Sequence, residues 1–290
     1  MDASLTITSA TAFMAALGGV LAILLVLANK RLYVYEDPRI EEVENMLPKA
    51  NCGACGQPGC HAFAEGLVTG DFQPSQCTAN SDDMNQLIAD NLGVAMSAQE
   101  KRLPRLACAG GNHVAWQRAR YKGLDSCRAA DLVAGGGKGC SWGCLGLGDC
   151  SHVCNFDAIS MDANGLPVVD EEKCTACGDC VDACPRFLFS IHPVSHKLWV
   201  ACKNLEHGEK AEEDCDVACN ACTRCVADVA SGLIAMTNNL ATIDYSQNNK
   251  ASRDAIQRCP TGAIVWMENG KVVKGDAARK VIRKDPLRAA

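Results

Sequence analysis

The stretch Cys174-Thr-Ala-Cys177-Gly-Asp-Cys180-Val-Asp-Ala-Cys184-Pro185 decides the fold of this chain. In its spacing, C-x2-C-x2-C-x3-C-P, the first three thiolates wrap one face of a [4Fe–4S] cube and the fourth points toward a neighbouring cube. Pro185 prevents the turn from continuing. A zinc ion held by four thiolates is the alternative. The stretch therefore predicts an iron–sulfur site with a partner run of cysteines nearby.

The partner run lies upstream, at Cys140-Ser-Trp-Gly-Cys144-Leu-Gly-Leu-Gly-Asp-Cys150-Ser-His-Val-Cys154, with the spacing C-x3-C-x5-C-x3-C. Residues 156–159 and 166–169 flank Asn164-Gly165 and predict a short hairpin between the two runs. Two runs separated by a hairpin are similar to a two-cluster ferredoxin, in which each run lends its last cysteine to the other cluster. We therefore expect one cluster on Cys140, Cys144, Cys150 and Cys184, and another on Cys174, Cys177, Cys180 and Cys154.

A second copy of this arrangement becomes visible when the sequence is shifted by 75 residues. Cys144 then falls on Cys219, Cys150 on Cys225, and Cys184-Pro185 on Cys259-Pro260, and such regularity indicates an internal duplication. One complete ligand set is missing from the copy, where the expected cysteines are replaced by Val229, Asn249, Ser252 and Ala255. The surviving set predicts one cluster on Cys219, Cys222, Cys225 and Cys259. Ligation through Cys215, Cys219 and Cys225 is the alternative.

Another group of cysteines precedes both copies, at Cys52-Gly-Ala-Cys55-Gly-Gln-Pro-Gly-Cys60 and Cys77. Four thiolates without a histidine predict a closed [4Fe–4S] site or a zinc site, and the glycines let the backbone bend closely around it. The loop resembles the small iron–sulfur domain found in corrinoid proteins and in the B subunit of the Rnf complex. Asp37-Pro38 and Ser81 are expected to start helices before and after this loop.

Four cysteines remain, one pair ahead of each copy: Cys108, Cys127, Cys202 and Cys215. If these four converge, the twenty cysteines complete five [4Fe–4S] sites. The alternative is four buried structural thiols, because free cysteine is among the most buried residue types.

The two ends of the chain differ in character from the rest. No charged residue occurs from Ala3 to Asn29, and this apolar stretch reaches the roughly 20 residues that a membrane-spanning helix needs. Lys30 and Arg31 follow directly, so the positive-inside rule places the N-terminus outside and the rest in the cytoplasm; a cleaved signal peptide, whose basic residues would come first, is the alternative. Residues 271–290 carry seven Lys or Arg against two acidic residues. This tail is expected to be a solvated helix or to contact anionic lipid or a neighbouring subunit.

The composition limits the classes of function. The chain has 290 residues, a net charge of −6 and twenty cysteines. It lacks the basic excess of nucleic-acid-binding proteins. Clustered cysteines on the cytoplasmic side of a membrane suit metal centres better than disulfides. Because the sequence contains no nucleotide fingerprint, activated nucleophile or open metal site, we expect electron transfer and no bond chemistry.

These observations predict an α+β chain in four parts. They are a transmembrane anchor at residues 1–30, a small 4Fe-4S domain at 31–103, a two-cluster ferredoxin-like domain with a cysteine-bearing lead-in at 104–197, and a second ferredoxin-like copy with one cluster and the basic tail at 198–290.

Together, the anchor, the Asn51-Cys-Gly-Ala-Cys-Gly motif, the two cysteine runs and the repeat resemble the B subunit of the Rnf complex over nearly the whole chain. The resemblance implies an electron-transfer subunit of a membrane-bound, ion-translocating ferredoxin:NAD+ oxidoreductase that binds neither NAD nor flavin itself. It implies soluble ferredoxin, membrane lipid and the other membrane and peripheral subunits as partners. The missing cube departs from the family pattern and leaves open whether the second copy conducts electrons or docks partners. A membrane-anchored ferredoxin subunit of another reductase or hydrogenase and a cluster-carrying scaffold are the alternatives.

Overall fold

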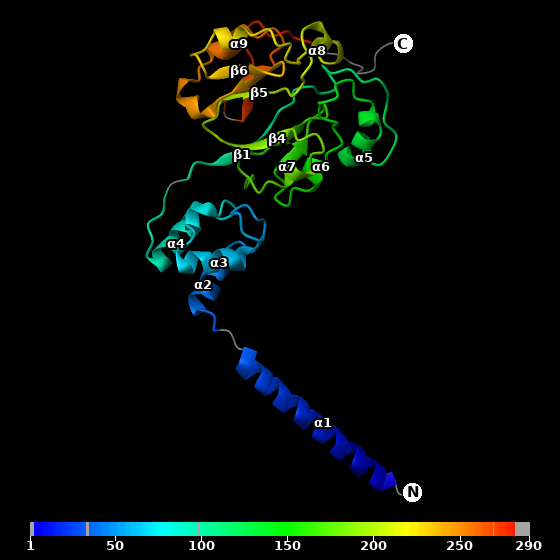
Figure 1. Cartoon of the computed structure of the whole chain (residues 1–290), viewed down its shortest axis with the longest axis vertical. Coiled ribbons are helices and arrows are strands. Elements are labelled where there is room, and N and C mark those ends of the chain that lie inside the picture. Colours follow the sequence, from blue (N-terminus) through cyan, green and yellow to red (C-terminus); the bar gives the residue numbers. More distant parts are fainter. Residues whose placement is uncertain (1–2, 33–34, 98, 269, 282–290) are drawn as a thin grey trace.

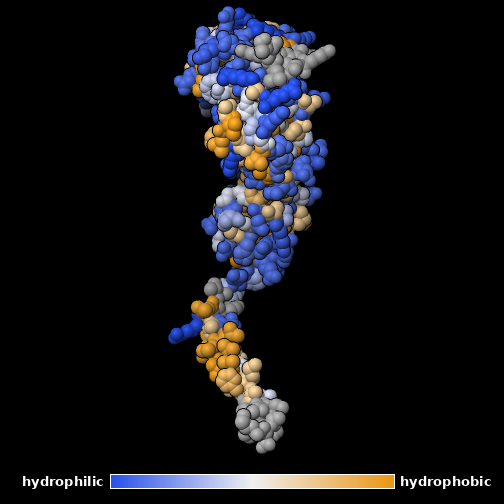
Figure 2. Space-filling view, turned by 90° about the vertical axis from the view of Figure 1, so that its right-hand side faces the viewer, coloured by the Kyte–Doolittle hydropathy of each residue, from blue (hydrophilic) through white to orange (hydrophobic). Residues whose placement is uncertain are grey.

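The computed structural model describes residues 3–32, 35–97, 99–268 and 270–281, so the end of the basic tail lies outside the described residues. Helix α1 (Ala3–Leu32) extends away from the rest of the chain as a single rod (Figure 1). Its stretch Ala10–Leu32 is long and apolar enough to cross a membrane, and none of it is buried against the protein. Figure 2 shows its apolar surface below a largely hydrophilic body. This exposure is what a lipid-facing helix requires.

A small helical module follows the anchor, with α2 (Pro38–Met46), α3 (Cys60–Thr69), the short 3-10 helix η1 (Pro74–Gln76) and α4 (Asp82–Leu92). The side chain of Asp37 accepts a hydrogen bond from Arg39 N at the start of α2, and Ser81 Oγ accepts one from Met84 N at the start of α4. The helix starts predicted from these two residues are therefore confirmed. The module packs around its own buried core, which contains Val43, Leu67, Phe63 and Ile88.

The next part of the chain, which we call the first repeat, runs from β1 to β4. It contains β1 (Arg102–Leu106), α5 (Cys127–Leu132), the short helix η2 (Ala134–Gly137), α6 (Asp149–His152), β2 (Ile159–Met161), β3 (Pro167–Val169), α7 (Asp179–Ala183) and β4 (Phe189–Pro193). The predicted hairpin is present as β2 and β3, which pair antiparallel with Ile159 opposite Val169. β1 pairs antiparallel with β4, so the two ends of the first repeat lie side by side.

The second repeat runs from β5 to β9. It contains β5 (Leu198–Val200), α8 (Glu209–Asp214), α9 (Arg224–Ala227), β6 (Ile234–Thr237), β7 (Leu240–Ile243), η3 (Tyr245–Lys250), α10 (Asp254–Gln257), β8 (Ile264–Glu268) and β9 (Lys271–Val273). Its β6–β7 hairpin corresponds to β2–β3, and its β5–β8 pair corresponds to β1–β4. The short helices α9 and α10 begin 75 residues after α6 and α7, in agreement with the shift found in the sequence.

The two repeats share a core instead of standing apart. The segment that follows β1 leaves the first repeat and runs along the second, where Ala109 N donates to Ala201 O at 3.0 Å and Trp116 N donates to Asp214 O at 2.8 Å. Ala115 pairs with Cys215 in an isolated antiparallel bridge. Val114 and Ala115 are consequently buried in the same cluster as the core of the second repeat. This crossing segment, residues 108–116, brings Cys108 of the first repeat to the second.

Candidate iron–sulfur centres

The structure contains five cavities that are each lined by four cysteine side chains, and each of the twenty cysteines lines one of them. The cavities are alike in size, and each measures between about 310 and 370 Å³ together with the solvent at its mouth. We number them as site 1 (Cys52, Cys55, Cys60, Cys77), site 2 (Cys154, Cys174, Cys177, Cys180), site 3 (Cys127, Cys144, Cys150, Cys184), site 4 (Cys108, Cys140, Cys202, Cys215) and site 5 (Cys219, Cys222, Cys225, Cys259).

Three of these sets are the ones expected from the sequence. Sites 1, 2 and 5 bring together the cysteines that the sequence grouped by spacing, by ferredoxin-like cross-ligation and by the internal repeat, respectively. The chain bends in the same way within two of the C-x2-C pairs, where the residue before the second cysteine, Ala176 at site 2 and Ala221 at site 5, has φ of 56° and 59°. A left-handed alanine is strained, and such strain clusters where a ligand is held. The alternative ligation through Cys215 does not fit, because Cys215 lines site 4.

One expected grouping is wrong in the structure. Cys140 does not join Cys144, Cys150 and Cys184, and Cys127 takes its place at site 3. The cause is the Asp149 carboxylate, which immediately precedes Cys150 and fixes the start of α5. It accepts hydrogen bonds from Cys127 N at 2.9 Å, from Arg128 N at 3.1 Å and from Ser126 Oγ at 3.0 Å. These contacts hold Cys127 against the site 3 cavity, although Cys127 precedes Cys150 by 23 positions in the sequence.

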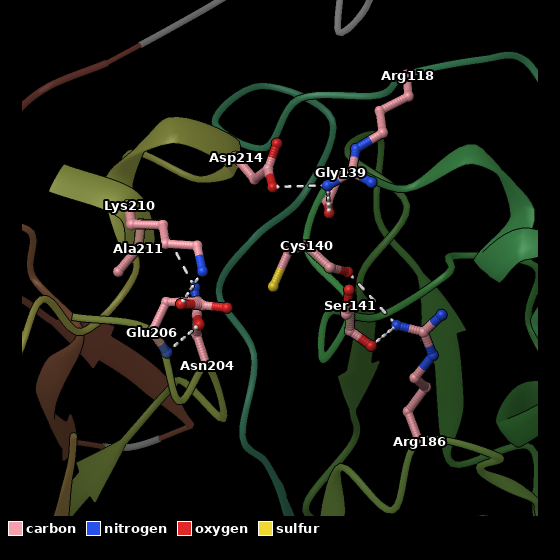
Figure 3. A network of polar contacts seen from close by, with 10 residues as sticks. All are labelled: Arg118, Gly139, Cys140, Ser141, Arg186, Asn204, Glu206, Lys210, Ala211 and Asp214. Atoms are coloured by element: carbon pink, nitrogen blue, oxygen red, sulfur yellow. Dashed lines mark hydrogen bonds and ion pairs between the residues drawn. The ribbon is translucent and has the colours of Figure 1, made fainter. Parts of the chain in front are cut away.

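Cys140 is turned toward the second repeat instead, where it lines site 4 with Cys108, Cys202 and Cys215. Figure 3 shows the networks on either side of it. Arg118 donates to Gly139 O at 3.0 Å and to Asp214 of the second repeat at 3.1 Å. Arg186 donates to the carbonyl oxygens of Ser141 and Cys140, and the sulfur of Cys140 points away from it. The expected convergence of Cys108, Cys127, Cys202 and Cys215 is therefore correct for three of the four.

Site 4 differs from the other four because two of its cysteines come from each repeat. The crossing segment places Cys108 beside Cys202 and Cys215, because Ala109, which follows Cys108 directly, and Ala115 both pair with the second repeat. The sequence carried a signal for this, since Cys108 follows β1 and Cys202 follows the corresponding strand β5. No local spacing links the two repeats, however, so the fourth member could not be identified as Cys140.

Burial shapes the chemistry of the cysteine thiols. It is the main cause that raises the pKa of Cys150 to about 11 and the pKa values of Cys144, Cys180, Cys215 and Cys225 to about 12. Such thiols do not ionise readily by themselves, but a coordinating metal deprotonates them and neutralises their charge. The cavities therefore suit groups that carry metal cations.

Backbone amides point at several of the sulfur atoms. Cys108 Sγ accepts hydrogen bonds from Gly110 N at 3.4 Å and from Cys144 N at 3.3 Å. The corresponding Cys202 Sγ accepts from Asn204 N at 3.4 Å and from Cys219 N at 3.2 Å. Hydrogen bonds to ligand sulfurs are one of the means by which proteins set the potential of an iron–sulfur cluster.

The spread of the sulfur atoms bears on the zinc alternative. In the part of the chain that the structure describes, no three His, Cys, Asp or Glu side chains are arranged to hold a single metal ion. Four thiolates around one zinc ion, each about 2.3 Å from it, would be such an arrangement. A four-iron cube with a thiolate at each iron does not require three side chains to meet at one ion, and four cysteines line each cavity.

Comparison with known proteins agrees with this geometry. A family model described as "Putative Fe-S cluster" matches residues 47–79, around site 1, and one described as "4Fe-4S binding domain" matches residues 165–186. The B subunit of the Na(+)-translocating ferredoxin:NAD(+) oxidoreductase complex of Acetobacterium woodii is 37% identical over 265 residues, which is 91% of this chain and 78% of that protein. The chain belongs to the family of Rnf complex B subunits.

Two further relatives support this membership along almost the whole length of the chain. The B subunit of the ion-translocating oxidoreductase complex of Methanosarcina acetivorans is 34% identical, over 90% of this chain and 98% of the relative. The B subunit of the proton-translocating ferredoxin:NAD(+) oxidoreductase complex of Clostridium ljungdahlii is 34% identical, over 89% of this chain and 91% of the relative. This member of the Rnf family is therefore an iron–sulfur protein of mixed helix and strand structure with an N-terminal apolar helix.

Proposed function

We propose that this chain is the electron-transfer subunit of a membrane-bound Rnf complex, and that it takes electrons from reduced ferredoxin in the cytoplasm and relays them toward the membrane subunits and NAD+. The observation that carries the proposal is the set of five four-cysteine cavities in a member of this family. A [4Fe–4S] cluster in each cavity would supply one-electron transfer, and the four thiolates would leave its irons without an open position for substrate. The protein would perform no bond chemistry of its own.

The domain organisation supports a relay of five sites. We infer a 4Fe-4S domain at residues 31–103, a two-cluster ferredoxin-like domain at 104–197 and a second ferredoxin-like copy at 198–290. The matching hairpins β2–β3 and β6–β7 and the matching strand pairs β1–β4 and β5–β8 favour the tandem arrangement. In the second copy the lost ligand set is replaced by Val229, Asn249, Ser252 and Ala255, of which Ala255 is buried in the core. Ala255 is thus part of the core, and Val229 lies partly buried against it.

The contacts between sites suggest their order along the relay, beginning at the anchor. Thr78, beside Cys77 of site 1, donates a hydrogen bond from Oγ1 to Thr175 O, beside Cys174 of site 2. Sites 2 and 3 share one buried cluster, in which Cys180 of one packs with Cys150 of the other.

The remaining steps of the row run through single hydrogen bonds between ligand residues. Cys144 N of site 3 donates to Cys108 Sγ of site 4. Cys219 N of site 5 donates to Cys202 Sγ of site 4. Each site is thus connected to the next by one hydrogen bond or packing contact between residues at or beside the cysteines. We infer the order site 1, site 2, site 3, site 4, site 5.

The membrane anchor indicates which end of the relay would be nearest the membrane. Lys30 and Arg31 in the last turn of α1 favour a cytoplasmic position for everything that follows, with the N-terminus outside. Site 1 lies in the first module after the anchor and would therefore be the site nearest the membrane. Electrons from a soluble donor would then enter farther along the row.

Rapid mixing tests the proposal directly. The full-length chain, purified without oxygen in detergent, should contain about twenty iron atoms, four for each set of four thiolates. Chemically reduced ferredoxin should pass electrons to the clusters of the chain, and the visible absorption of those clusters should decrease during the mixing experiment. Iron-loaded protein that takes up no electrons from ferredoxin, or that co-purifies only with subunits of another reductase, would refute the proposed donor or complex.

The variant Cys127→Ala tests the inferred order, because it removes site 3 from the middle of the row. Ferredoxin should then reduce quickly only the sites on its own side of the gap, and the others slowly. Cys55→Ala is the matched control, since site 1 stands at the end of the row away from the donor and its loss should interrupt nothing else. Equal, complete reduction of all remaining sites in both variants would contradict the order.

A further inference from the structure

The five cavities differ in the charged side chains that line them. Among the described residues, the linings of sites 1 and 5 contain no charged side chain apart from the cysteines, and that of site 2 contains one, Asp179. Site 3 is lined by one acid, Asp149, and one base, Arg186. Site 4 alone is lined by two bases, Lys138 and Lys203, with no Asp or Glu in its lining.

Lys138 is the more deeply placed of the two lysines. Its side chain is only 8% exposed, and Nζ donates to Gly110 O at 2.6 Å. Gly110 N in turn donates to Cys108 Sγ, so the ammonium group is bonded to a residue that itself contacts a site 4 cysteine. A side chain on Gly143 would lie 3.3 Å from Cε of Lys138, which shows how closely the lysine is packed. Lys203 is half-buried and donates to Phe187 O at 2.6 Å.

The base at site 3 is compensated, whereas Lys138 is not balanced within its cavity. Arg186 Nε forms an ion pair with Asp131 at 2.6 Å, and Asp149 lines the same cavity. Lys138 lies two residues before Cys140 of site 4, and no acidic side chain lines that cavity with it.

We propose that Lys138 tunes site 4 so that it is the most easily reduced of the five sites. The inference deepens the proposed relay and rests on the iron–sulfur occupancy that the relay requires. Reduction adds one electron from the donor to a site that is already anionic because of its four thiolates, and no bond or proton changes. A buried ammonium group stabilises that extra charge strongly because little water screens it. The four amide hydrogen bonds to Cys108 and Cys202 act in the same direction.

The position of site 4 gives this tuning a consequence. It stands between sites 3 and 5 and takes two cysteines from each repeat. The first electron to enter the row would therefore rest at site 4, at the junction of the repeats. Later electrons would occupy the sites of lower reduction potential. Lys138 would act only through its positive charge beside site 4 and would not bind the iron.

A redox titration followed by electron paramagnetic resonance tests the proposal on the intact, anaerobically purified chain, with dithionite and mediators as reductant. The site 4 signal is identified by its loss in Cys140→Ala. It should be the first to appear as the potential is lowered. In Lys138→Gln, which removes the charge, the equilibrium constant for reducing this site should fall at least tenfold, or about 59 mV for one electron. Lys138→Arg should restore most of the difference.

Two further variants keep the test decisive. Lys210→Gln is the control, because Lys210 is exposed and paired with Glu206, and it should shift nothing. If Lys138→Gln fails to load site 4, Lys203→Gln must still shift the site 4 signal to lower potential, by less than the buried lysine would. A wild-type titration in which another site is reduced first, or an unshifted signal in Lys138→Gln or in this replacement, would overturn the proposal. Because no ferredoxin takes part, failure here is separate from failure of the proposed donor.

Discussion

The exchange of Cys127 and Cys140 between sites 3 and 4 leads to a prediction that separates the structure from the sequence pattern. If Cys140 shared a cluster with Cys144, as the spacing suggests, Cys140→Ala and Cys144→Ala would remove the same paramagnetic signal. In the structure the two residues line different cavities. We therefore expect the two variants to remove different signals, while Cys127→Ala and Cys144→Ala remove the same one. Each variant should lose about four of about twenty iron atoms.

The loss of site 4 should also loosen the two repeats, because it is the site that draws cysteines from both. A cluster there would join Cys108 to Cys202, which are 94 residues apart. A cross-link over a loop of that length restricts the unfolded chain by about 4.7 kcal/mol. A cluster at site 3 would shorten the loop to the 18 positions from Cys184 to Cys202, for which the same relation gives about 3 kcal/mol. Cys140→Ala should therefore weaken the junction by about 3 kcal/mol.

Limited proteolysis under anaerobic conditions measures this effect at the connection between β4 and β5, residues 194–197. The cleavage rate depends on how often the junction between the repeats opens. If opening becomes easier by about 3 kcal/mol, cleavage should accelerate on the order of a hundredfold. Cys127→Ala is the matched control, because all four cysteines of site 3 come from the first repeat and their loss leaves the junction bridged. Equal acceleration in the two variants, or a shared signal for Cys140 and Cys144, would refute the assignment of site 4.

Three further predictions concern other parts of the chain. Cys180→Ser should abolish the site 2 signal alone, and an unchanged spectrum would contradict that ligand set. Burial is the main cause that lowers the pKa values of His192 and His196, so the unfolded chain binds protons there more readily. Their contribution to stability is complete above about pH 6.5 and is lost as the pH falls through the lowered values; His192→Phe should flatten that acid loss in thermal melts, and an unaltered slope would count against it. Gly66→Ala would place a carbon 2.1 Å from the Phe72 ring and should destabilise the first module by about 1–3 kcal/mol in the same melts. An unchanged midpoint would show that the ring moves aside freely.

Most of the local structure could be read from the sequence because it depends on neighbouring residues. The caps at Asp37 and Ser81 and the hairpin around Asn164-Gly165 are set within a few residues, and the structure contains all three. The apolar stretch of α1 likewise needs no partner to be recognised. The cysteine sets of sites 1, 2 and 5 follow from spacing within runs, with a single longer-range member in each, at Cys77, Cys154 and Cys259.

The sequence by itself predicted cysteine sets of four, placed an apolar helix ahead of them, and showed Val229, Asn249, Ser252 and Ala255 where a shift of 75 residues would put cysteines. Only the tertiary structure decided which cysteines complete sites 3 and 4, and that Lys138 is buried at the second of these. The physical reason is that the crossing segment after β1 is held along the second repeat by backbone hydrogen bonds, such as Ala109 N to Ala201 O, that any residue types could make. Such bonds leave no pattern in the side chains, so the meeting of Cys108 with Cys202 exists only once the chain has folded.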